Sequence, residues 1–420
     1  MTTQEIQPQS RFSYGYIVVS ASLVIVTIAE GILYSFGVFF APLLGEFGWT
    51  RAMTSGALSL STVVHIPILI VVGRLTDRFG PRLVLSACGF FLGLGYLLMS
   101  QTNAIWQLYL FYGVIASIGM GFYWVPIISI IPRWFIKKRG LMMAIVTSGV
   151  GIGQLVVPPL ANWLISIYGW RKSYLIIGSI TMGVIMLAAQ FLKQHPIQMG
   201  QLPYNENKVE EKNSVGKVDG LSIRAVVHTR PFWIASMLFL SWGFCLSIVM
   251  VHSVIHAIGL GMSPASAANI LAIIGGAGIA GRLAFGRIAD AIGMKPVLII
   301  SMSLISISFL CLLTGTEMWV LYLFAAIFGI SYGTMEILQS PIMANLFGLS
   351  SLATLMGLNT AIGAIGFVVG PVLGGYIFDV TGSYHIVFII CAAMAMICIM
   401  LSTLLPLTRD KEERHYKSQL

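Results

Sequence analysis

The sequence predicts an all-α integral membrane protein in which twelve transmembrane helices form two related six-helix bundles. Of its 420 residues 57% are apolar and only 9% are charged, and the mean hydropathy is +0.89, whereas soluble proteins carry about 25% charged residues. Long apolar segments and an internal repeat, both described below, support the same prediction. The net charge of +9 does not indicate nucleic-acid binding, because the basic residues lie in separate short loops.

Each predicted helix is an apolar segment of roughly 20 residues or more, the length that crosses the hydrocarbon core of a bilayer. The segments are 15–41, 53–73, 83–101, 105–131, 141–166, 173–192, 232–258, 265–286, 295–314, 318–343, 353–378 and 384–406. One long polar stretch separates the sixth from the seventh. We therefore expect an N-terminal bundle over 1–192, a central loop over 193–230, and a C-terminal bundle with its tail over 231–420.

The basic residues predict the orientation of the chain in the membrane. If the N-terminus lies inside, all but four of the 24 Lys and Arg residues fall in inner loops or in the two tails. The exceptions are Arg51, Arg171 and Lys172 in outer loops and Arg282 inside a span. We expect a multi-pass protein of the cell inner (plasma) membrane with both termini in the cytoplasm, and the long first apolar segment does not resemble a cleavable signal peptide.

The sequence contains no pattern typical of a metal site or of a catalytic centre. Its five cysteines lie in apolar segments without metal-ligand spacing, so we expect no disulfide, no metal and no other cofactor. The glycine runs lie inside spans rather than after strands, so they do not indicate a nucleotide-binding loop. An enzyme is therefore the least favoured class of function.

A ten-residue loop occurs twice, once after the second span and once after the eighth. Gly73–Arg82 reads GRLTDRFGPR and Gly286–Lys295 reads GRIADAIGMK, 213 residues apart. Six spans followed by six related spans place a substrate site at the interface of the two halves, near the membrane midplane. The residues of these loops that we single out as a conformational motif are Gly73, Asp77, Arg78, Gly80, Gly286 and Asp290.

Arg282 is a cation inside an otherwise uncharged apolar segment that runs from Met262 to Leu283. An arginine at the centre of a spanning helix costs roughly 2.5–3.5 kcal/mol on insertion scales. Its planar fork of donors can bind a carboxylate through two hydrogen bonds. We therefore predict that Arg282 binds an anionic substrate, and the alternative is a buried ion pair that only holds helices together.

Two acidic residues also lie deep in predicted spans, Glu30 in the first and Glu336 in the tenth. Phe328, Tyr332 and Glu336 follow one another at i, i+4 and i+8 and therefore share one helix face. Either acid could pair with Arg282 in the empty protein and take up a proton when an anion replaces it. Glu336 is the preferred candidate, and the alternative for Glu30 is a carboxyl group without a role in transport.

The repeated loop and the plan of six plus six spans resemble the major facilitator superfamily over nearly the whole chain. Within that superfamily, the pattern Gly281–Asp290 (GRLAFGRIAD) resembles the monocarboxylate transporters and the related oxalate–formate antiporters, including bacterial monocarboxylate transporters. Tyr34–Pro42 (YSFGVFFAP) and Glu46–Arg51 (EFGWTR) support the same resemblance. It implies alternating access to a small carboxylate anchored by Arg282, with the repeated loops bracing the cytoplasmic side in one conformation.

Several further residues are candidates for binding the substrate. The family has a tyrosine among its substrate contacts at the position that matches Tyr123, and we also carry forward Tyr332 for its place beside Glu336. His252 is retained for its position in the seventh span and for the resemblance, since a neutral histidine can donate to a carboxylate. Tyr34 and Asn359 are weaker candidates, and plain packing is the alternative for each aromatic residue.

The chain departs from the family in three places that bear on its substrate. Proton-coupled animal members have an aspartate one turn before the arginine, where this chain has Gly278, and a lysine in the first span, near Tyr34 here. Any proton coupling must therefore use other groups, such as Glu336 or Glu30. Oxalate exchangers have a second cation in the eleventh span, which contains none here, so one carboxylate is favoured over two.

These observations predict a secondary active transporter of small monocarboxylates such as lactate or pyruvate, working by proton-coupled symport and alternating access. The expected partners are the carboxylate, protons and the lipid bilayer, and no nucleic acid. An anion exchanger like the oxalate–formate antiporters is the first alternative. A membrane sensor that binds a carboxylate without transporting it is a further, less favoured alternative.

Overall fold

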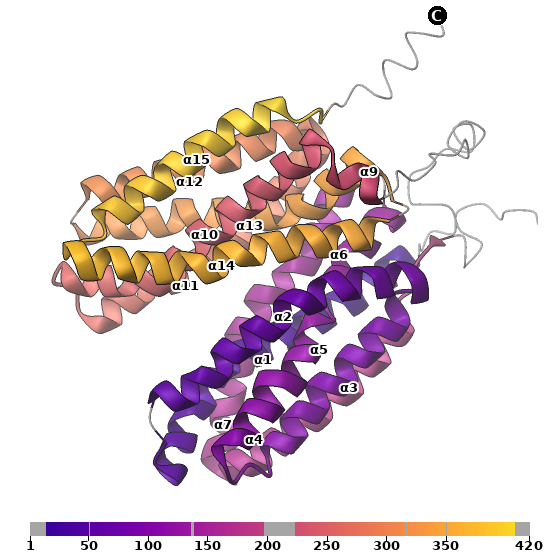
Figure 1. Cartoon of the computed structure of the whole chain (residues 1–420), viewed down its shortest axis with the longest axis vertical. Coiled ribbons are helices and arrows are strands. Elements are labelled where there is room, and N and C mark those ends of the chain that lie inside the picture. Colours follow the sequence, from indigo (N-terminus) through magenta and orange to yellow (C-terminus); the bar gives the residue numbers. More distant parts are fainter. Residues whose placement is uncertain are drawn as a thin grey trace, which may run out of the picture. The chain divides into compact units, whose positions relative to one another are not determined.

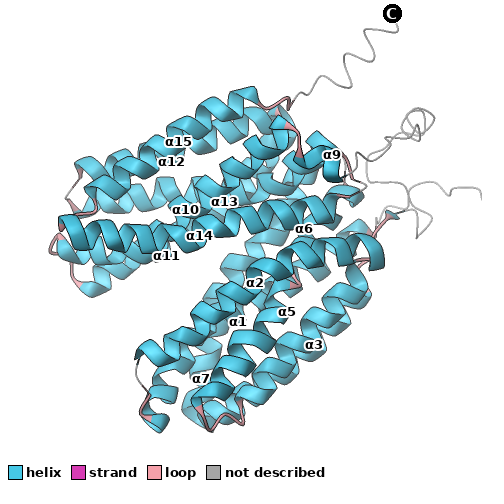
Figure 2. Cartoon of the chain, in the orientation of Figure 1, coloured by secondary structure: helices cyan, strands magenta, loops and turns pink. Residues whose placement is uncertain are grey.

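The computed structural model describes residues 14–49, 51–135, 138–196, 223–315, 317–349 and 351–407. Helices account for the regular structure of this part of the chain, and no strand occurs in it (Figure 2). The predicted all-α class is therefore confirmed. Most of the predicted central loop, residues 197–222, and the end of the C-terminal tail lie outside the described residues.

The first half of the chain contains the helices that correspond to predicted spans one to six (Figure 1). They are α1 (Gly15–Phe47), α2 (Arg51–Phe79), α3 (Pro81–Met99), α4 (Ile105–Leu108), the π-helix η1 (Tyr109–Ala116), α5 (Ser117–Gly121), α6 (Trp124–Trp134) and α7 (Arg139–Gln190). The fourth predicted span is therefore not one regular helix but four consecutive pieces. Such π-helical segments often occur near functional sites, and this one leads into the turn that presents Tyr123.

The second half of the chain contains the helices that correspond to predicted spans seven to twelve (Figure 1). They are α10 (Arg230–Gly259), α11 (Pro264–Ile292), α12 (Met294–Thr314), α13 (Met318–Phe347), α14 (Leu352–Thr381) and α15 (His385–Leu404). The short α9 (Ile223–Val227) precedes them and lies within the predicted central loop, which is therefore partly helical. Local sequence explains several of the helix starts. A proline occupies the first turn of α3, α10 and α11, where its missing N–H costs nothing, and the Ser263 hydroxyl accepts a hydrogen bond from Ser266 N at the start of α11.

Eleven described helices, or helix groups, are long and apolar enough to cross a bilayer. The 52-residue α7 contains two of the predicted spans, 141–166 and 173–192. They are separated at Gly169, whose φ of 76° and ψ of 163° are not helical, and such a positive φ favours glycine. Each of the twelve predicted spans therefore coincides with described helical structure over most of its length.

The chain forms two compact units, and two helices contribute to both of them. Among the described residues, the N-terminal unit comprises those up to 135, 145–196 and 351–358, and the C-terminal unit comprises 138–144, those from 223 to 349, and 359–407. The first turns of α7 therefore belong to the C-terminal unit, and the first turns of α14 belong to the N-terminal unit. This exchange is symmetric, because residues 138–144 correspond to residues 351–357 at the 213-residue spacing of the repeated loops.

The backbone repeats this spacing at glycines with a positive φ. Six such glycines of the described chain form three pairs 213 residues apart: Gly48 and Gly261, Gly80 and Gly293, and Gly169 and Gly382. In the second pair the two residues even share a ψ of 163°. The structure therefore extends the repeat well beyond the ten-residue loop that the sequence reveals.

Glycines also allow the helices that carry the charged residues to approach closely. In the C-terminal unit α11 packs along α13, and a Cβ on Gly281 would lie 2.8 Å from Ile330 Cα. A Cβ on Gly333 of α13 would in turn meet the carbonyl oxygen of Gly278 and lie 3.1 Å from Arg282 Cγ. Small residues at such a contact let membrane helices pack backbone against backbone.

We predict that Gly281→Ala destabilises the protein by about 1–3 kcal/mol, the usual cost of adding a methyl group to a closely packed interface. Gly183→Ala is the matched control, because a Cβ on Gly183 would meet nothing within 4 Å, and alanine there should be neutral or stabilising by up to about 1 kcal/mol. Thermal unfolding in detergent measures both. Equal midpoints for the two variants would contradict the proposed packing of α11 against α13.

Candidate functional site

The C-terminal unit contains a buried ion pair between α11 and α13. Arg282 is 1% exposed and Glu336 is 6% exposed. The Arg282 Nε–H donates to Glu336 Oε2 at 2.8 Å, and Arg282 Nη2 also donates to this oxygen. Of the two acids considered from sequence, it is Glu336 that pairs with the buried arginine. The two charges cancel, which offsets much of the cost of burying either one alone.

One aromatic side chain lies against this pair, and a second stacks on the first. The Arg282 guanidinium carbon lies 4.8 Å from the centre of the Tyr332 ring, a distance at which a cation is attracted to the ring face. Tyr332 also stacks with Trp242 of α10, with ring centres 6.2 Å apart and planes 10° apart. A Cβ on Gly278 would lie 3.2 Å from Tyr332 and 3.3 Å from Arg282 Nη1, so this glycine gives both side chains room.

The N-terminal unit contains a second buried acid with a different partner. Glu30 of α1 is 9% exposed and Tyr123, immediately before α6, is 4% exposed. The Tyr123 hydroxyl donates a hydrogen bond to Glu30 Oε1. Tyr34 lies one helical turn after Glu30 on α1, and 41% of its surface is exposed. Three of the predicted site residues therefore belong to one region of this unit.

His252 and Asn359 do not contact the ion pair. The two ring nitrogens of His252 lie 3.1 Å from the Tyr384 hydroxyl and 3.0 Å from the Pro371 carbonyl oxygen, so this histidine connects α10 with α14 and with the residue before α15. Asn359 is 0% exposed, and neither its amide nitrogen nor its amide oxygen has a hydrogen-bond partner. Their assignment as substrate-binding residues stays a prediction.

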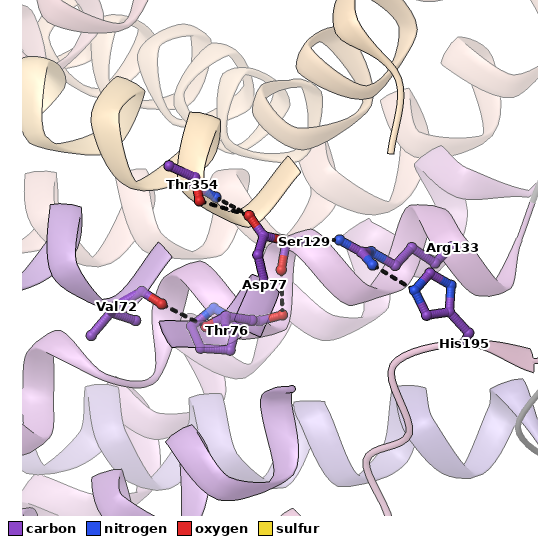
Figure 3. Close-up of polar contacts among 8 residues, drawn as sticks. Val72, Thr76, Asp77, Ser129, Arg133, His195 and Thr354 are labelled. Atoms are coloured by element: carbon purple, nitrogen blue, oxygen red, sulfur yellow. Dashed lines mark hydrogen bonds and ion pairs between the residues drawn. The ribbon is translucent and has the colours of Figure 1, made fainter. Parts of the chain in front are cut away.

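The two repeated segments were predicted as loops, but in the structure they form the end of one helix and the start of the next, with only Gly80 and Gly293 outside a helix. The first copy holds a polar network within the N-terminal unit (Figure 3). Asp77 Oδ2 accepts hydrogen bonds from Thr354 N at 2.8 Å and from Thr354 Oγ1 at 2.7 Å. Asp77 Oδ1 accepts from Arg133 Nη2 at 3.2 Å. Thr354 lies in the first turn of α14, where backbone N–H groups lack helical partners and a negative charge is favourable.

The second copy repeats this arrangement within the C-terminal unit. Asp290 accepts hydrogen bonds from Gly140 N at 2.8 Å and from Leu141 N at 3.0 Å, in the first turn of α7. A Cβ on Gly286 would lie 2.8 Å from the Gly140 carbonyl oxygen, and one on Gly73 would lie 2.7 Å from Thr354 Cα. In both copies the glycine thus allows the approach that brings the aspartate to a helix start.

Other residues of the predicted motif have different surroundings. Arg78 is exposed, and its guanidinium carbon lies 5.2 Å from the centre of the Phe79 ring. Gly80 has a φ of 81°, a value that favours glycine, and it ends the loop directly before α3. Arg78 has no basic counterpart in the second copy, where the equivalent residue is Ala291.

The sequence interpretation did not single out Arg133, His195 or Trp242. The buried Arg133 also contacts His195, with 2.9 Å between Nη1 and Nε2 (Figure 3). A signal for Trp242 exists in the sequence, since it lies near the middle of its span whereas membrane tryptophans gather at the two interfaces. No cluster of three or more His, Cys, Asp or Glu side chains able to hold a metal occurs among the described residues.

We predict that the contact between His195 and Arg133 makes stability fall at acidic pH. Burial and then the charge of Arg133 lower the pKa of His195 below its usual 6.5, because both disfavour the protonated imidazole. Above pH about 6.5 the imidazole is neutral in both folded and unfolded chains, and below it the unfolded chain binds the proton more tightly. Unfolding midpoints measured from pH 7.5 to 5.5 should drop less in His195→Gln than in the unmodified protein, and parallel curves would contradict this prediction.

Curated relatives resemble the chain over most of its length. It is 26% identical over 387 residues to monocarboxylate transporter 13 of Rattus norvegicus, covering 91% of this chain and 87% of that protein. It is 28% identical over 374 residues to monocarboxylate transporter 4 of Mus musculus, covering 87% and 78%.

Solved structures of transporters share the fold. The E. coli fucose:proton symporter aligns with a TM-score of 0.69 at 14% identity, covering 94% of this chain and 100% of that one. A proton:xylose symporter aligns with a TM-score of 0.72 at 14% identity, covering 94% and 96%. Residues 20–294 and 259–419 both match the family model of the Major Facilitator Superfamily. The chain is therefore a multi-pass membrane transporter that belongs to the Major Facilitator Superfamily.

Proposed function

We propose that this protein is a proton-coupled symporter of small monocarboxylates, such as lactate or pyruvate, that works by alternating access. The observation that carries the proposal is the buried pair of Arg282 and Glu336 in the C-terminal unit. The names of the relatives, monocarboxylate transporters 13 and 4, support this substrate class. We also infer from the basic residues that both termini face the cytoplasm of a plasma-membrane protein.

The geometry of the pair supports competition between Glu336 and a substrate carboxylate. The two hydrogen bonds that Arg282 donates to Glu336 both reach Oε2, so this contact is not the two-oxygen fork that a carboxylate can form with a guanidinium. A substrate carboxylate can offer both of its oxygens to the same donors. In the proposed cycle Glu336 takes up a proton and releases Arg282, and the substrate anion then binds there.

Charge balance explains why a proton would accompany the anion. In the empty protein the charges of Arg282 and Glu336 cancel, and in the loaded protein a protonated Glu336 leaves Arg282 paired with the substrate. The site is neutral in both states. It can therefore switch from one side of the membrane to the other without the free-energy cost of moving an unpaired charge through a region of low dielectric. Each pH unit across the membrane then supports about tenfold accumulation of the anion.

The N-terminal unit supplies a second acid that can carry a proton. Glu30 is 9% exposed and accepts a hydrogen bond from Tyr123. We propose that Tyr123, Tyr34 and Tyr332 line the path of the substrate, with His252 and Asn359 as weaker contacts. Glu30 would then assist Glu336 in proton coupling.

The repeated loops support alternating access. Asp77 and Asp290 each bind the first turn of a helix that belongs to both units. A change of conformation that moves the main part of α14 or α7 would break these hydrogen bonds. We propose that both aspartates stabilise one conformation by holding these helix starts on the cytoplasmic side.

The test of the anion site is uptake of labelled L-lactate into proteoliposomes under an inward proton gradient. Arg282→Ala should lower uptake at least a hundredfold, because it removes both donors to the carboxylate and leaves Glu336 buried without its partner. Arg282→Lys should also fail, since a lysine cannot form the planar fork. Arg224→Ala, at an exposed arginine of α9, is the control and should keep uptake within about twofold. Normal uptake by Arg282→Ala would refute the anion site.

A second substitution tests the proton coupling. Glu336→Gln cannot exchange a proton, so gradient-driven accumulation of L-lactate should disappear. Exchange of external labelled lactate for preloaded lactate should persist. The neutral glutamine resembles a protonated glutamate, so the carrier can change conformation in either direction while lactate is bound. Undiminished gradient-driven accumulation by the variant would exclude Glu336 as the proton carrier. Exchange without gradient-driven uptake in the unmodified protein would identify an antiporter instead.

A further inference from the structure

Trp242 carries a buried hydrogen-bond donor that has no acceptor. The Nε1–H of this residue, near the middle of α10, is inaccessible to solvent and contacts no hydrogen-bond partner. An unmatched buried donor destabilises a protein, and such groups in native structures call for a specific explanation. By contrast, the indole of Trp233 in the same helix donates to the Val227 carbonyl oxygen at 2.8 Å.

The surroundings of Trp242 connect this donor with the anion site. Tyr332 is the common neighbour, because its ring lies 4.8 Å from the Arg282 guanidinium carbon and stacks with Trp242 at 6.2 Å between ring centres. Phe367 of α14 and Phe239 of α10 contact the indole edge-on, at 5.7 and 6.5 Å between ring centres. The donor therefore belongs to an apolar aromatic cluster of the C-terminal unit that adjoins the buried cation.

We propose that Trp242 Nε1–H donates a hydrogen bond to an oxygen on carbon 2 of the substrate and thereby selects 2-hydroxy and 2-oxo monocarboxylates over unsubstituted ones. This inference rests on the proposed function, in which Arg282 binds the carboxylate group. Since the guanidinium occupies both carboxylate oxygens, the only other acceptor of a short acid is the oxygen on its second carbon. The rings of Phe239 and Phe367 provide apolar surface for the remaining carbon atoms.

The chemistry of the indole defines which acids fit. An indole N–H is a donor only, so it can bind a hydroxyl or a keto oxygen equally well. A 2-ammonium group has only donors, so it cannot accept a hydrogen bond from the indole N–H, and the two groups would repel each other. The structure therefore assigns lactate and pyruvate to one class, propionate to a weaker class that leaves the donor unmatched, and alanine to the rejected class.

The first test uses the unmodified protein and a panel of acids of equal carbon number. Competition against labelled L-lactate in proteoliposomes should give propionate an inhibition constant about tenfold higher than pyruvate, the approximate value of one hydrogen bond. Alanine should not compete. Equal inhibition by propionate and pyruvate would overturn the proposal without any need for a variant.

The second test removes the donor while keeping a ring. In Trp242→Phe the ratio of the KM for propionate to the KM for lactate should fall from about 10 to about 1, because the stacking partner of Tyr332 remains and only the N–H is lost. Trp233→Phe is the matched control, and its ratio should stay at the unmodified value. An unchanged ratio in Trp242→Phe, or the same shift in both variants, would overturn the proposal.

Failure of this inference is distinguishable from failure of the proposed function. If the unmodified protein transports neither lactate nor propionate, the substrate class is wrong and both proposals fall. If it transports both acids with one KM, the proposed function stands and the role of Trp242 is refuted. A rise in the thermal unfolding midpoint of Trp242→Phe in detergent when propionate is added shows that the variant still folds and binds a carboxylate.

Discussion

The free-energy cost of burying a charge in a low-dielectric environment explains why Arg282 and Glu336 must pair in the C-terminal unit. Arg282 and Glu336 are both almost completely buried, and each alone would cost several kcal/mol. Their pairing depends on the close approach of α11 and α13 at Gly278, Gly281 and Gly333. The glycines, which carry no chemistry themselves, therefore determine where the guanidinium lies. The same approach brings Tyr332 under the guanidinium and so connects the anion site with the aromatic cluster around Trp242.

The carboxylates of Asp77 and Asp290 have a different role, which is to accept hydrogen bonds at the starts of helices. Asp77 and Asp290 accept hydrogen bonds from the first turns of α14 and α7, where helices have unmatched N–H groups. These hydrogen bonds join residues far apart in the chain, and each can be replaced by a hydrogen bond to water when the helix start moves away. A buried ion pair without a replacement anion is costly to break. The proposed cycle thus combines reversible contacts at helix starts with a charged site that opens only when a proton and an anion arrive together.

Hydropathy and length were sufficient to predict all twelve spans, since crossing a bilayer leaves few alternatives for the backbone. The pairing of charges was only partly predictable: helical spacing placed Tyr332 and Glu336 on one face and made Glu336 the preferred acid, but the sequence left Glu30 as an alternative partner of Arg282. That choice depends on packing between α11 and α13. Trp242 was missed because a tryptophan in an apolar span is usually a packing residue; its place near the middle of the span is a weak signal, and its unmatched N–H is visible only in the structure. His195 was missed because its contact with Arg133 joins residues 62 positions apart.

The repeat is symmetric in its backbone but not in its chemistry. Three pairs of positive-φ glycines keep the 213-residue spacing, yet Arg282 corresponds to Leu69 and Glu336 corresponds to Tyr123. At this shared position one unit has a hydroxyl that binds the acid Glu30, and the other has an acid that binds the cation Arg282. A symmetric pair of cations would bind two carboxylates, whereas one cation binds one. The asymmetry at positions 69 and 282 therefore favours a monocarboxylate, and the asymmetry at positions 123 and 336 gives the two units different surroundings for their buried acids, Glu30 and Glu336.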